Sequence, residues 1–136
     1  MVELDHVVGA MGHAPGMVAT DNTAVTMGSG TLPVLATPAI VALVEQAASQ
    51  AISSYLPPGM TTVGTGLALR HLAATPLGHN IQAEAILTRV SGRKLEYKVA
   101  AYDEREKIAE GTHERFIVDV ERFMAKMSDK KPKGIG

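Results

Sequence analysis

The sequence predicts an α+β domain in which an antiparallel sheet wraps around one long central helix. Two observations lead to this prediction. One long apolar segment, residues 37–54, carries helix signals at both ends, whereas the later segments alternate apolar and polar residues between short polar turns. An alternating sheet has one apolar face that must be buried against another element, so the sheet has to cover the helix.

The first thirty residues are rich in glycine and contain the β-branched run Thr23-Ala-Val-Thr26, which is closed by Gly28-Ser-Gly30. β-branched residues favour strands and glycine favours turns. This region is therefore expected to form one strand or two short ones, followed by a loop through Pro33.

The central helix has clear boundaries. Thr37 is a suitable N-cap, Pro38 suits the first helical position, and Tyr55-Leu-Pro-Pro-Gly59 stops the helix. The roughly 17 residues between these signals span ~26 Å, the width of a small domain. The helix is apolar nearly all round, and one sheet cannot cover so much apolar surface. A second copy of the chain is therefore expected to help bury it, which predicts a homodimer and leaves a higher oligomer open.

The strands of the sheet follow the helix, and three of them are joined by the short turns at 91–93 and 103–105. Every second residue from Leu95 to Ala101 is apolar, which is typical of a strand with one buried face. Consecutive hairpins form an antiparallel meander, and a meander curled around a central helix is the hot-dog arrangement. The strands are expected at residues 61–74, 80–90, 94–102 and 107–120. A single domain is expected over residues 1–125, with a basic, flexible tail at 126–136.

Composition argues against several function classes. The net charge of −1 over 136 residues provides no large basic field for nucleic acid or an anionic membrane, so neither is an expected partner. The absence of cysteine excludes disulfides, thiol catalysis and cysteine-ligated zinc, and a cytoplasmic location is the default. No basic leader precedes an apolar segment, and no apolar run approaches the ~20 residues of a spanning helix. The protein is expected to be soluble and unprocessed.

Glu45 is the most informative charge. It is the only formal charge between Asp21 and Arg70, and its neighbours three and four residues away on the helix carry none. A cationic partner must then come from another element or from a ligand. Without one, burial would raise the pKa of the carboxyl and leave a reactive base. The alternative is that Glu45 simply points outward beside Gln46 and Gln50.

The histidines and glycines are less specific. None of the five histidines stands in HxxxH or a comparable ligand spacing, so no metal site is expected. His71 lies in an apolar strand, where a structural role competes with a catalytic one, and His79 and His113 border loops and are expected at the surface. The glycines at 64 and 66 lack the context of a nucleotide-binding loop and favour a bulge or the close approach of another chain or ligand.

Four stretches resemble the fluoroacetyl-CoA thioesterase-like branch of the hot-dog thioesterases. The resemblance runs in register from Ala36 to Lys126, and the GTHER and HLAATPLG blocks are its most specific parts. The stretches are ATPAIVALVE at 36–45, VGTGLALRHLAATPLG at 63–78, VSGRKLEYKVAAYDE at 90–104 and EGTHERFIVDVERFMAK at 110–126.

The resemblance implies a homodimeric hot-dog fold and metal-independent hydrolysis of a short acyl-CoA thioester to the free acid and CoA. Coenzyme A is then part of the substrate, and no cofactor is expected. The catalytic threonine, glutamate and histidine of the family fall on Thr37, Glu45 and His71. Its substrate-contacting glycine and arginine fall on Gly64 and Arg115.

Several alternatives stay open at this level. In members selective for fluoroacetyl-CoA the segment before the threonine is longer and carries phenylalanines, whereas VTMGSGTLPVLAT at 25–37 has no aromatic residue, which argues against such selectivity. Glu45 can act as a general base or as a nucleophile. Eight residues, ~12 Å of helical rise, separate Thr37 from Glu45, so one site takes them either from one subunit through a bridging substrate or from two. A non-catalytic acyl-CoA-binding module and an enoyl-CoA hydratase are the competing functions.

Overall fold

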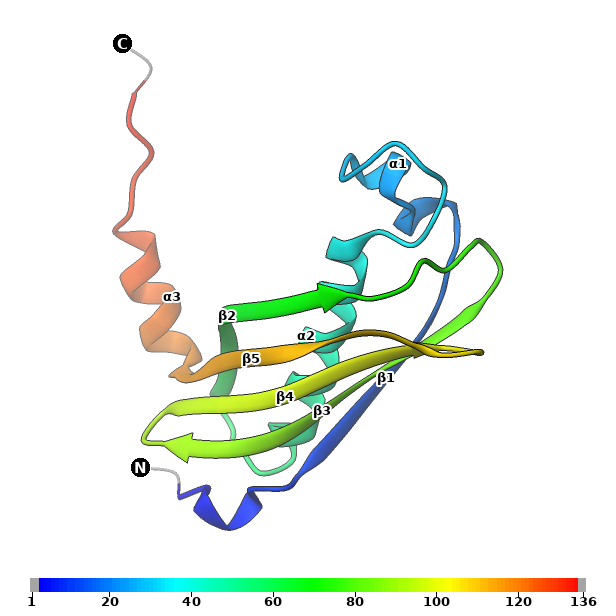
Figure 1. Cartoon of the computed structure of the whole chain (residues 1–136). Helices are drawn as coiled ribbons and strands as arrows, with labels where there is room; N and C mark the ends of the chain where they lie inside the picture. Colours follow the sequence, from blue (N-terminus) through cyan, green and yellow to red (C-terminus); the bar gives the residue numbers. More distant parts are fainter. Residues whose placement is uncertain (1–2, 135–136) are drawn as a thin grey trace.

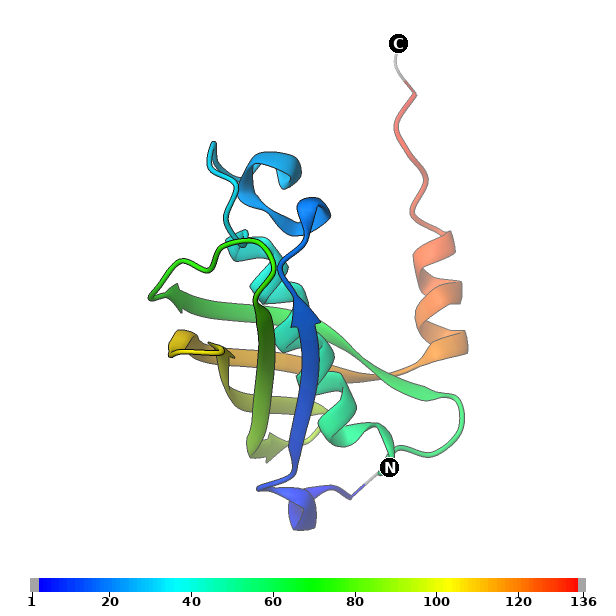
Figure 2. The same cartoon turned by 90° about the vertical axis from the view of Figure 1, so that its right-hand side faces the viewer.

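A five-stranded antiparallel sheet curls around the long helix α2 (Figures 1 and 2), as the sequence predicts. The computed structural model describes residues 3–134. The strand order is β1-β3-β4-β5-β2, so β1 and β2 are the two edges of the sheet. The elements in chain order are η1 Asp5–Val7, β1 Met11–Met17, η2 Thr20–Asn22, α1 Ala24–Met27, α2 Thr37–Ser53, β2 Met60–His71, β3 Asn80–Ser91, β4 Lys94–Asp103, β5 Lys107–Asp119 and α3 Val120–Ser128.

Helix α2 has the predicted length, but the prediction for its first residue was wrong. The N-cap is Ala36, and no side chain caps the helix. Thr37 is the first helical residue, and its hydroxyl is hydrogen-bonded to His71 instead of to the backbone. The tertiary contact with His71 therefore uses the hydroxyl that local capping rules would assign to the end of the helix.

One side of α2 faces the sheet and the other does not. The sheet side is fully apolar and consists of Ile40, Val44, Ala47, Ala48, Ala51 and Ile52, all buried. On the other side Ala42 is exposed, whereas Val41 and Glu45 are partly exposed. The single sheet therefore leaves apolar side chains on this side of α2 uncovered. This is the reason that a second copy of the chain was expected.

The amino-terminal region differs from the prediction. The first strand, β1, comes before the β-branched run, and Thr23–Thr26 leads into the one-turn helix α1. The Thr23 hydroxyl accepts a hydrogen bond from the Thr26 amide, and Gly28 ends the turn with a φ of 76°. A side-chain cap and a left-handed glycine outweigh the weak strand preference of β-branched residues here.

Strand β1 lies directly on α2. A Cβ atom at Gly12 would overlap the carbonyl oxygen of Ala47 in the helix, so only glycine allows this close approach. β1 pairs with β3, and β3, β4 and β5 form the predicted meander. In β4 the apolar residues from Leu95 to Ala101 point to the core, which confirms the predicted alternation. The core therefore lies between the concave face of the sheet and α2.

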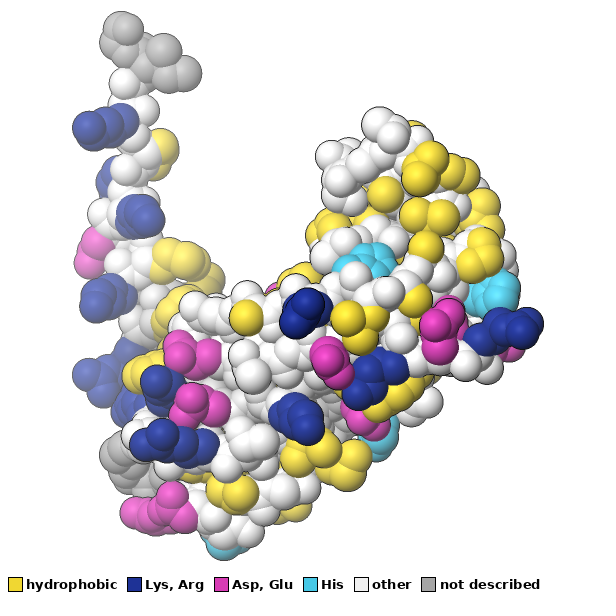
Figure 3. Space-filling model, viewed as in Figure 1, with side chains coloured by type: hydrophobic (Ala, Val, Ile, Leu, Met, Phe, Trp, Pro, Cys, Tyr) yellow, Lys and Arg dark blue, Asp and Glu magenta, His cyan; other side chains and the backbone are white. Residues whose placement is uncertain are grey.

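The chain leaves the sheet earlier than predicted. A carboxylate oxygen of Asp119 accepts a hydrogen bond from the Arg122 amide and starts α3, so Val120 is helical. Helix α3 continues past Lys126 to Ser128, and the division of the chain into 1–125 and 126–136 stays a prediction. Figure 3 shows a hollow between α3 and the lobe that carries α1. No helix within residues 3–134 has the length and apolarity to cross a bilayer.

Candidate active site

The first group of candidate residues lies where α2 begins and β2 ends. The Thr37 hydroxyl is 2.8 Å from Nδ1 of His71. Thr37 is exposed, His71 is partly buried, and its Nε2 is buried with no hydrogen-bond partner among the described residues. When the hydroxyl donates to Nδ1, Nε2 carries the ring proton and can donate it to a substrate. The pair therefore combines an oriented hydroxyl with a proton donor.

The second group lies two turns further along α2. Nη1 of Arg115, on β5, is 3.2 Å from Oε2 of Glu45. The guanidinium is buried, whereas 39% of the Glu45 side chain is exposed. Arg115 also donates from Nε to Thr62 Oγ1 at 2.9 Å and from Nη2 to the Thr62 carbonyl at 3.1 Å. Glu45 thus has a cationic partner from another element, as its helical neighbours require, and keeps an accessible carboxylate.

Gly64 completes the second group. It lies opposite Arg115 in the register of β2 and β5, beside a bulge between Gly64 and Gly66. A Cβ atom at Gly64 would overlap Oε2 of Glu45. The predicted bulge is present. The group that lies close to Gly64 is a carboxylate of the same chain, whereas the alternative prediction was another chain or a ligand.

His113 belongs to this group as well, and its predicted surface position was wrong. The residue is 3% exposed, and its Nδ1 is 2.7 Å from the Gly66 carbonyl oxygen. Its Nε2 is 3.2 Å from Nη1 of Arg115 and 4.0 Å from Oε2 of Glu45. Burial is the main reason that the pKa of His113 lies below its ordinary value. The alternation of β5 was the available signal, because His113 shares its parity with Arg115 and Ile117.

The two groups remain apart within one chain. Thr37 and Glu45 are separated by ~12 Å of helical rise, and seven residues of β2, roughly 20 Å of strand, separate Gly64 from His71. The structure therefore brings Thr37 together with His71, and Glu45 together with Gly64 and Arg115. It does not bring all five together.

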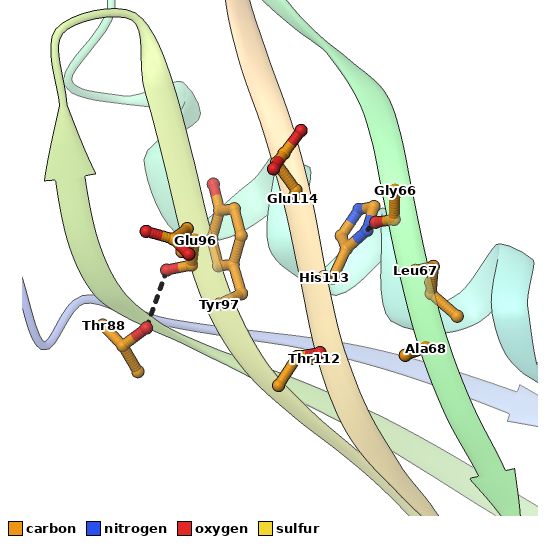
Figure 4. Close-up of a pocket in the computed structure, with 9 residues that line it drawn as sticks. All are labelled: Gly66, Leu67, Ala68, Thr88, Glu96, Tyr97, Thr112, His113 and Glu114. Carbon is orange, nitrogen blue, oxygen red and sulfur yellow. Dashed lines mark hydrogen bonds between the residues drawn. The ribbon is translucent and has the colours of Figure 1, made fainter.

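The pocket in Figure 4 is not the candidate site. It has a volume of about 360 Å³ and borders His113, Gly66 and Tyr97, and it contains none of the five predicted residues. Within residues 3–134 no group of three or more histidine, aspartate or glutamate side chains could hold a metal ion. The chemistry available to the two groups consists of a carboxylate, a hydroxyl, an imidazole and a guanidinium.

Comparison with known proteins identifies the family of the chain. The family of fluoroacetyl-CoA-specific thioesterases matches residues 18–121. A fluoroacetyl-CoA thioesterase from Streptantibioticus cattleyicolor is 42% identical over 101 residues, which are 74% of this chain and 73% of that protein. The solved structure of the fluoroacetyl-CoA thioesterase FlK has a TM-score of 0.85 at 35% identity and covers 92% of this chain and 97% of its own.

A more distant neighbour shows the same fold. A hot-dog-like protein from Thermanaerovibrio acidaminovorans has a TM-score of 0.86 at 20% identity, over 97% of this chain and 99% of its own. Likeness at this level of identity extends to the fold alone. The matching family and the closer relatives carry the assignment further, and the chain belongs to the fluoroacetyl-CoA-specific thioesterase family of hot-dog proteins.

Proposed function

We propose that this protein hydrolyses a short acyl-CoA thioester at a site formed by Thr37, Glu45 and His71, with Gly64 and Arg115 contacting the substrate. The observation that supports it most strongly is the division of these residues into two complementary groups. One group offers the hydroxyl and imidazole, and the other offers the carboxylate beside a buried guanidinium. Each supplies one half of what thioester hydrolysis needs.

The proposed chemistry assigns one task to each side chain. The Glu45 carboxylate removes a proton from water, and the resulting hydroxide attacks the thioester carbonyl carbon. The Thr37 hydroxyl donates to Nδ1 of His71, so the Nε2–H of His71 faces the substrate and stabilises the carbonyl oxygen as negative charge develops on it. The carbon–sulfur bond then breaks, and Glu45 returns the proton that it took from water to the CoA thiolate, with His71 assisting the transfer. No metal ion takes part in this scheme.

An alternative route leads through a covalent intermediate. Here the Glu45 carboxylate attacks the thioester carbonyl itself, CoA leaves, and water hydrolyses the resulting anhydride. Single-turnover hydrolysis in ¹⁸O-labelled water tests this route. Label incorporated into the Glu45 carboxyl supports an anhydride that water opens at the Glu45 carbonyl. An unlabelled Glu45 is expected for the general base and for an anhydride that water opens at the acyl carbon.

The two groups are proposed to meet across a homodimer. Strand β2 is an edge of the sheet, so one row of its backbone groups has no neighbouring strand within residues 3–134. Such an edge is a template for pairing with another strand. An antiparallel β2 pair centred between Leu67 and Ala68 would place His71 beside the Gly64 of the second copy, because both lie equally far from that centre. The uncovered side of α2 would be covered in the same step.

Mixed dimers test this arrangement directly. Thr37→Ala and Glu45→Ala chains, each inactive alone, are refolded together. When each site takes Thr37 and Glu45 from different chains, every heterodimer keeps one intact site and the mixture regains about one quarter of the wild-type activity. When each site lies within one chain, the mixture stays inactive. Sedimentation of a stable monomer at micromolar concentration would contradict the dimer itself.

Assays over acetyl- to octanoyl-CoA, phenylacetyl-CoA and fluoroacetyl-CoA test the activity and identify the acyl group. Hydrolysis that is lost in Glu45→Ala supports the proposal. Water addition to a 2-enoyl-CoA would indicate a hydratase, and tight binding of CoA esters without turnover would indicate a binding module. A cytoplasmic location is part of the proposal, and cell fractionation checks it.

A further inference from the structure

Within residues 3–134 His113 is the only buried histidine, and the hydrolysis scheme above does not use it. Two hydrogen bonds define its ring state. Because a carbonyl oxygen can only accept, the 2.7 Å contact with Gly66 places a proton on Nδ1. Because the Arg115 guanidinium can only donate, the 3.2 Å contact places a lone pair on Nε2. The partners thus assign a neutral ring with its proton on Nδ1.

The ring is held in place by its surroundings. Tyr97 stacks on it with ring centroids 6.0 Å apart and an angle of 29° between the planes. Figure 4 shows the His113 ring between β5 and β2, directed toward Gly66. Rotation about the side-chain bonds would cost both hydrogen bonds and the stacking contact. His113 is therefore a rigid acceptor at a defined position.

Arg115 depends on that acceptor. Its Nη1 carries two protons, one directed at Glu45 and one at His113, both at 3.2 Å. Without the acceptor at His113, the proton on that side would be unpartnered in a buried position. The guanidinium would then rotate to satisfy it, and the contact with Glu45 would change.

We propose that His113 is a positioning residue that, through Arg115, holds the Glu45 carboxylate toward the thioester and, through the Gly66 carbonyl, holds the bulge of β2 at Gly64. The inference rests on the proposed function. It adds a second requirement, that the ring stays neutral and keeps its proton on Nδ1.

A protonated ring would disrupt this arrangement. Nε2 would become a donor facing the Arg115 donor, two cations would lie side by side, and Nε2–H would compete for Glu45 at 4.0 Å. Burial lowers the pKa of His113 most, and the repulsion from Arg115 lowers it further, whereas the hydrogen bond to the Gly66 carbonyl and the nearby carboxylates act the other way. The charged and titratable groups that face the ring are Glu45 of α2, Tyr97 of β4, and Glu114 and Arg115 of β5.

The test uses three variants of the full chain. His113→Phe keeps a ring for stacking and removes both hydrogen bonds, whereas His113→Gln supplies a neutral donor and acceptor. His13→Gln is the matched control at an exposed histidine of β1. We expect His113→Phe to lower kcat by about 10-fold to 100-fold with KM within about threefold, and His113→Gln to recover most of the loss. An unchanged kcat in His113→Phe, or equal losses in both variants, would overturn the proposal.

A second readout does not depend on turnover. Nitrogen-15 NMR of the histidine rings at pH 7 is expected to show His113 as the neutral tautomer protonated at Nδ1. Slow exchange of the Arg115 Nε–H is expected in the wild type and in His113→Gln, and fast exchange in His113→Phe. A ring protonated at Nε2, or slow exchange in all variants, would contradict the positioning role. If the wild type cleaves no thioester, the proposed function fails while this readout still tests the positioning role.

Discussion

The two ends of the α2 segment from Thr37 to Glu45 are built very differently. Thr37 is exposed, and within residues 3–134 its hydroxyl has one hydrogen-bond partner, His71. Glu45 contacts a buried guanidinium that is itself held by Thr62 and by His113. An exposed hydroxyl can hydrogen-bond to water and needs no protein partner. A carboxylate at the margin of an apolar core needs a cationic partner, and a buried cation in turn needs hydrogen-bond acceptors of its own. The Glu45 end therefore contributes to the packing of the fold as well as to the proposed chemistry, and the Thr37 end contributes to the proposed chemistry alone.

The largest expected effect is on turnover. Glu45→Gln keeps the shape of the side chain and an oxygen that accepts from Arg115, but it removes the base. We expect kcat to fall by about 10³-fold with the fold intact, because general acid–base groups contribute on this scale. Steady-state hydrolysis across the acyl-CoA panel measures it. More than a tenth of wild-type activity on every substrate would show that Glu45 is not the base.

The next effect comes from Gly64. In Gly64→Ala the new methyl group would displace the Glu45 carboxylate, so we expect about 100-fold lower kcat/KM. Gly66→Ala is the matched control, because a Cβ atom there has nothing nearer than the Glu114 Cβ at 3.9 Å. Equal effects of the two substitutions would show that backbone flexibility, and not the contact with Glu45, is what the glycine provides.

The Glu45 end and the Thr37 end should contribute differently to the free energy of unfolding. Arg115→Met leaves the Thr62 oxygens and the His113 ring without their donor, and we expect the free energy of unfolding to fall by about 2 kcal/mol. Thr37→Val removes one exposed hydrogen bond, and we expect a loss below about 1 kcal/mol. Urea unfolding at a fixed protein concentration measures both, since association would add to stability. Similar losses at the two ends would contradict the comparison.

The smallest effect concerns Tyr97 and appears at high pH. Burial raises the pKa of Tyr97 to about 12, an effect that Arg115 partly offsets. Between its ordinary pKa near ~10 and this value the unfolded chain loses the phenolic proton while the folded chain keeps it, so stability falls as pH rises. Tyr97→Phe should remove that part of the fall. At pH 7 it should change stability by less than about 1 kcal/mol, because the buried hydroxyl has no hydrogen-bond partner among residues 3–134.

The effect of Tyr97→Phe on stability is measured as a difference from the wild type at each pH. Thermal melts of the wild type and of Tyr97→Phe from pH 7 to pH 11 give the difference in their melting temperatures. The contributions of the lysines and of the other tyrosines are the same in both proteins and cancel in this difference. Parallel melting curves over the whole range would show that the Tyr97 phenol is not protected by folding.

The elements that could be predicted are those with a strong local pattern. The apolar run of α2 with Pro38 near its start and the alternation from Leu95 to Ala101 both predict the observed element and its buried face. The run at Thr23–Thr26 misleads, because four residues carry little strand preference and a side-chain cap decides the outcome. His113 was misplaced because its neighbours in sequence suggest a loop, whereas its buried contacts come from β2 and β4.

The candidate site shows the same division. The isolation of Glu45 in the charge pattern is a property of the chain, and it already requires a cation from elsewhere. Which cation responds is decided by the register of β2 and β5, which sets Gly64 opposite Arg115 and brings the guanidinium to the helix. The sequence by itself determined the helix, the alternating strands, the family resemblance and the need for a partner, since these depend on residues close in the chain. Only the tertiary structure decided that Thr37 bonds His71 and that Glu45 bonds Arg115, because both contacts join residues that meet only after the sheet has curled around the helix.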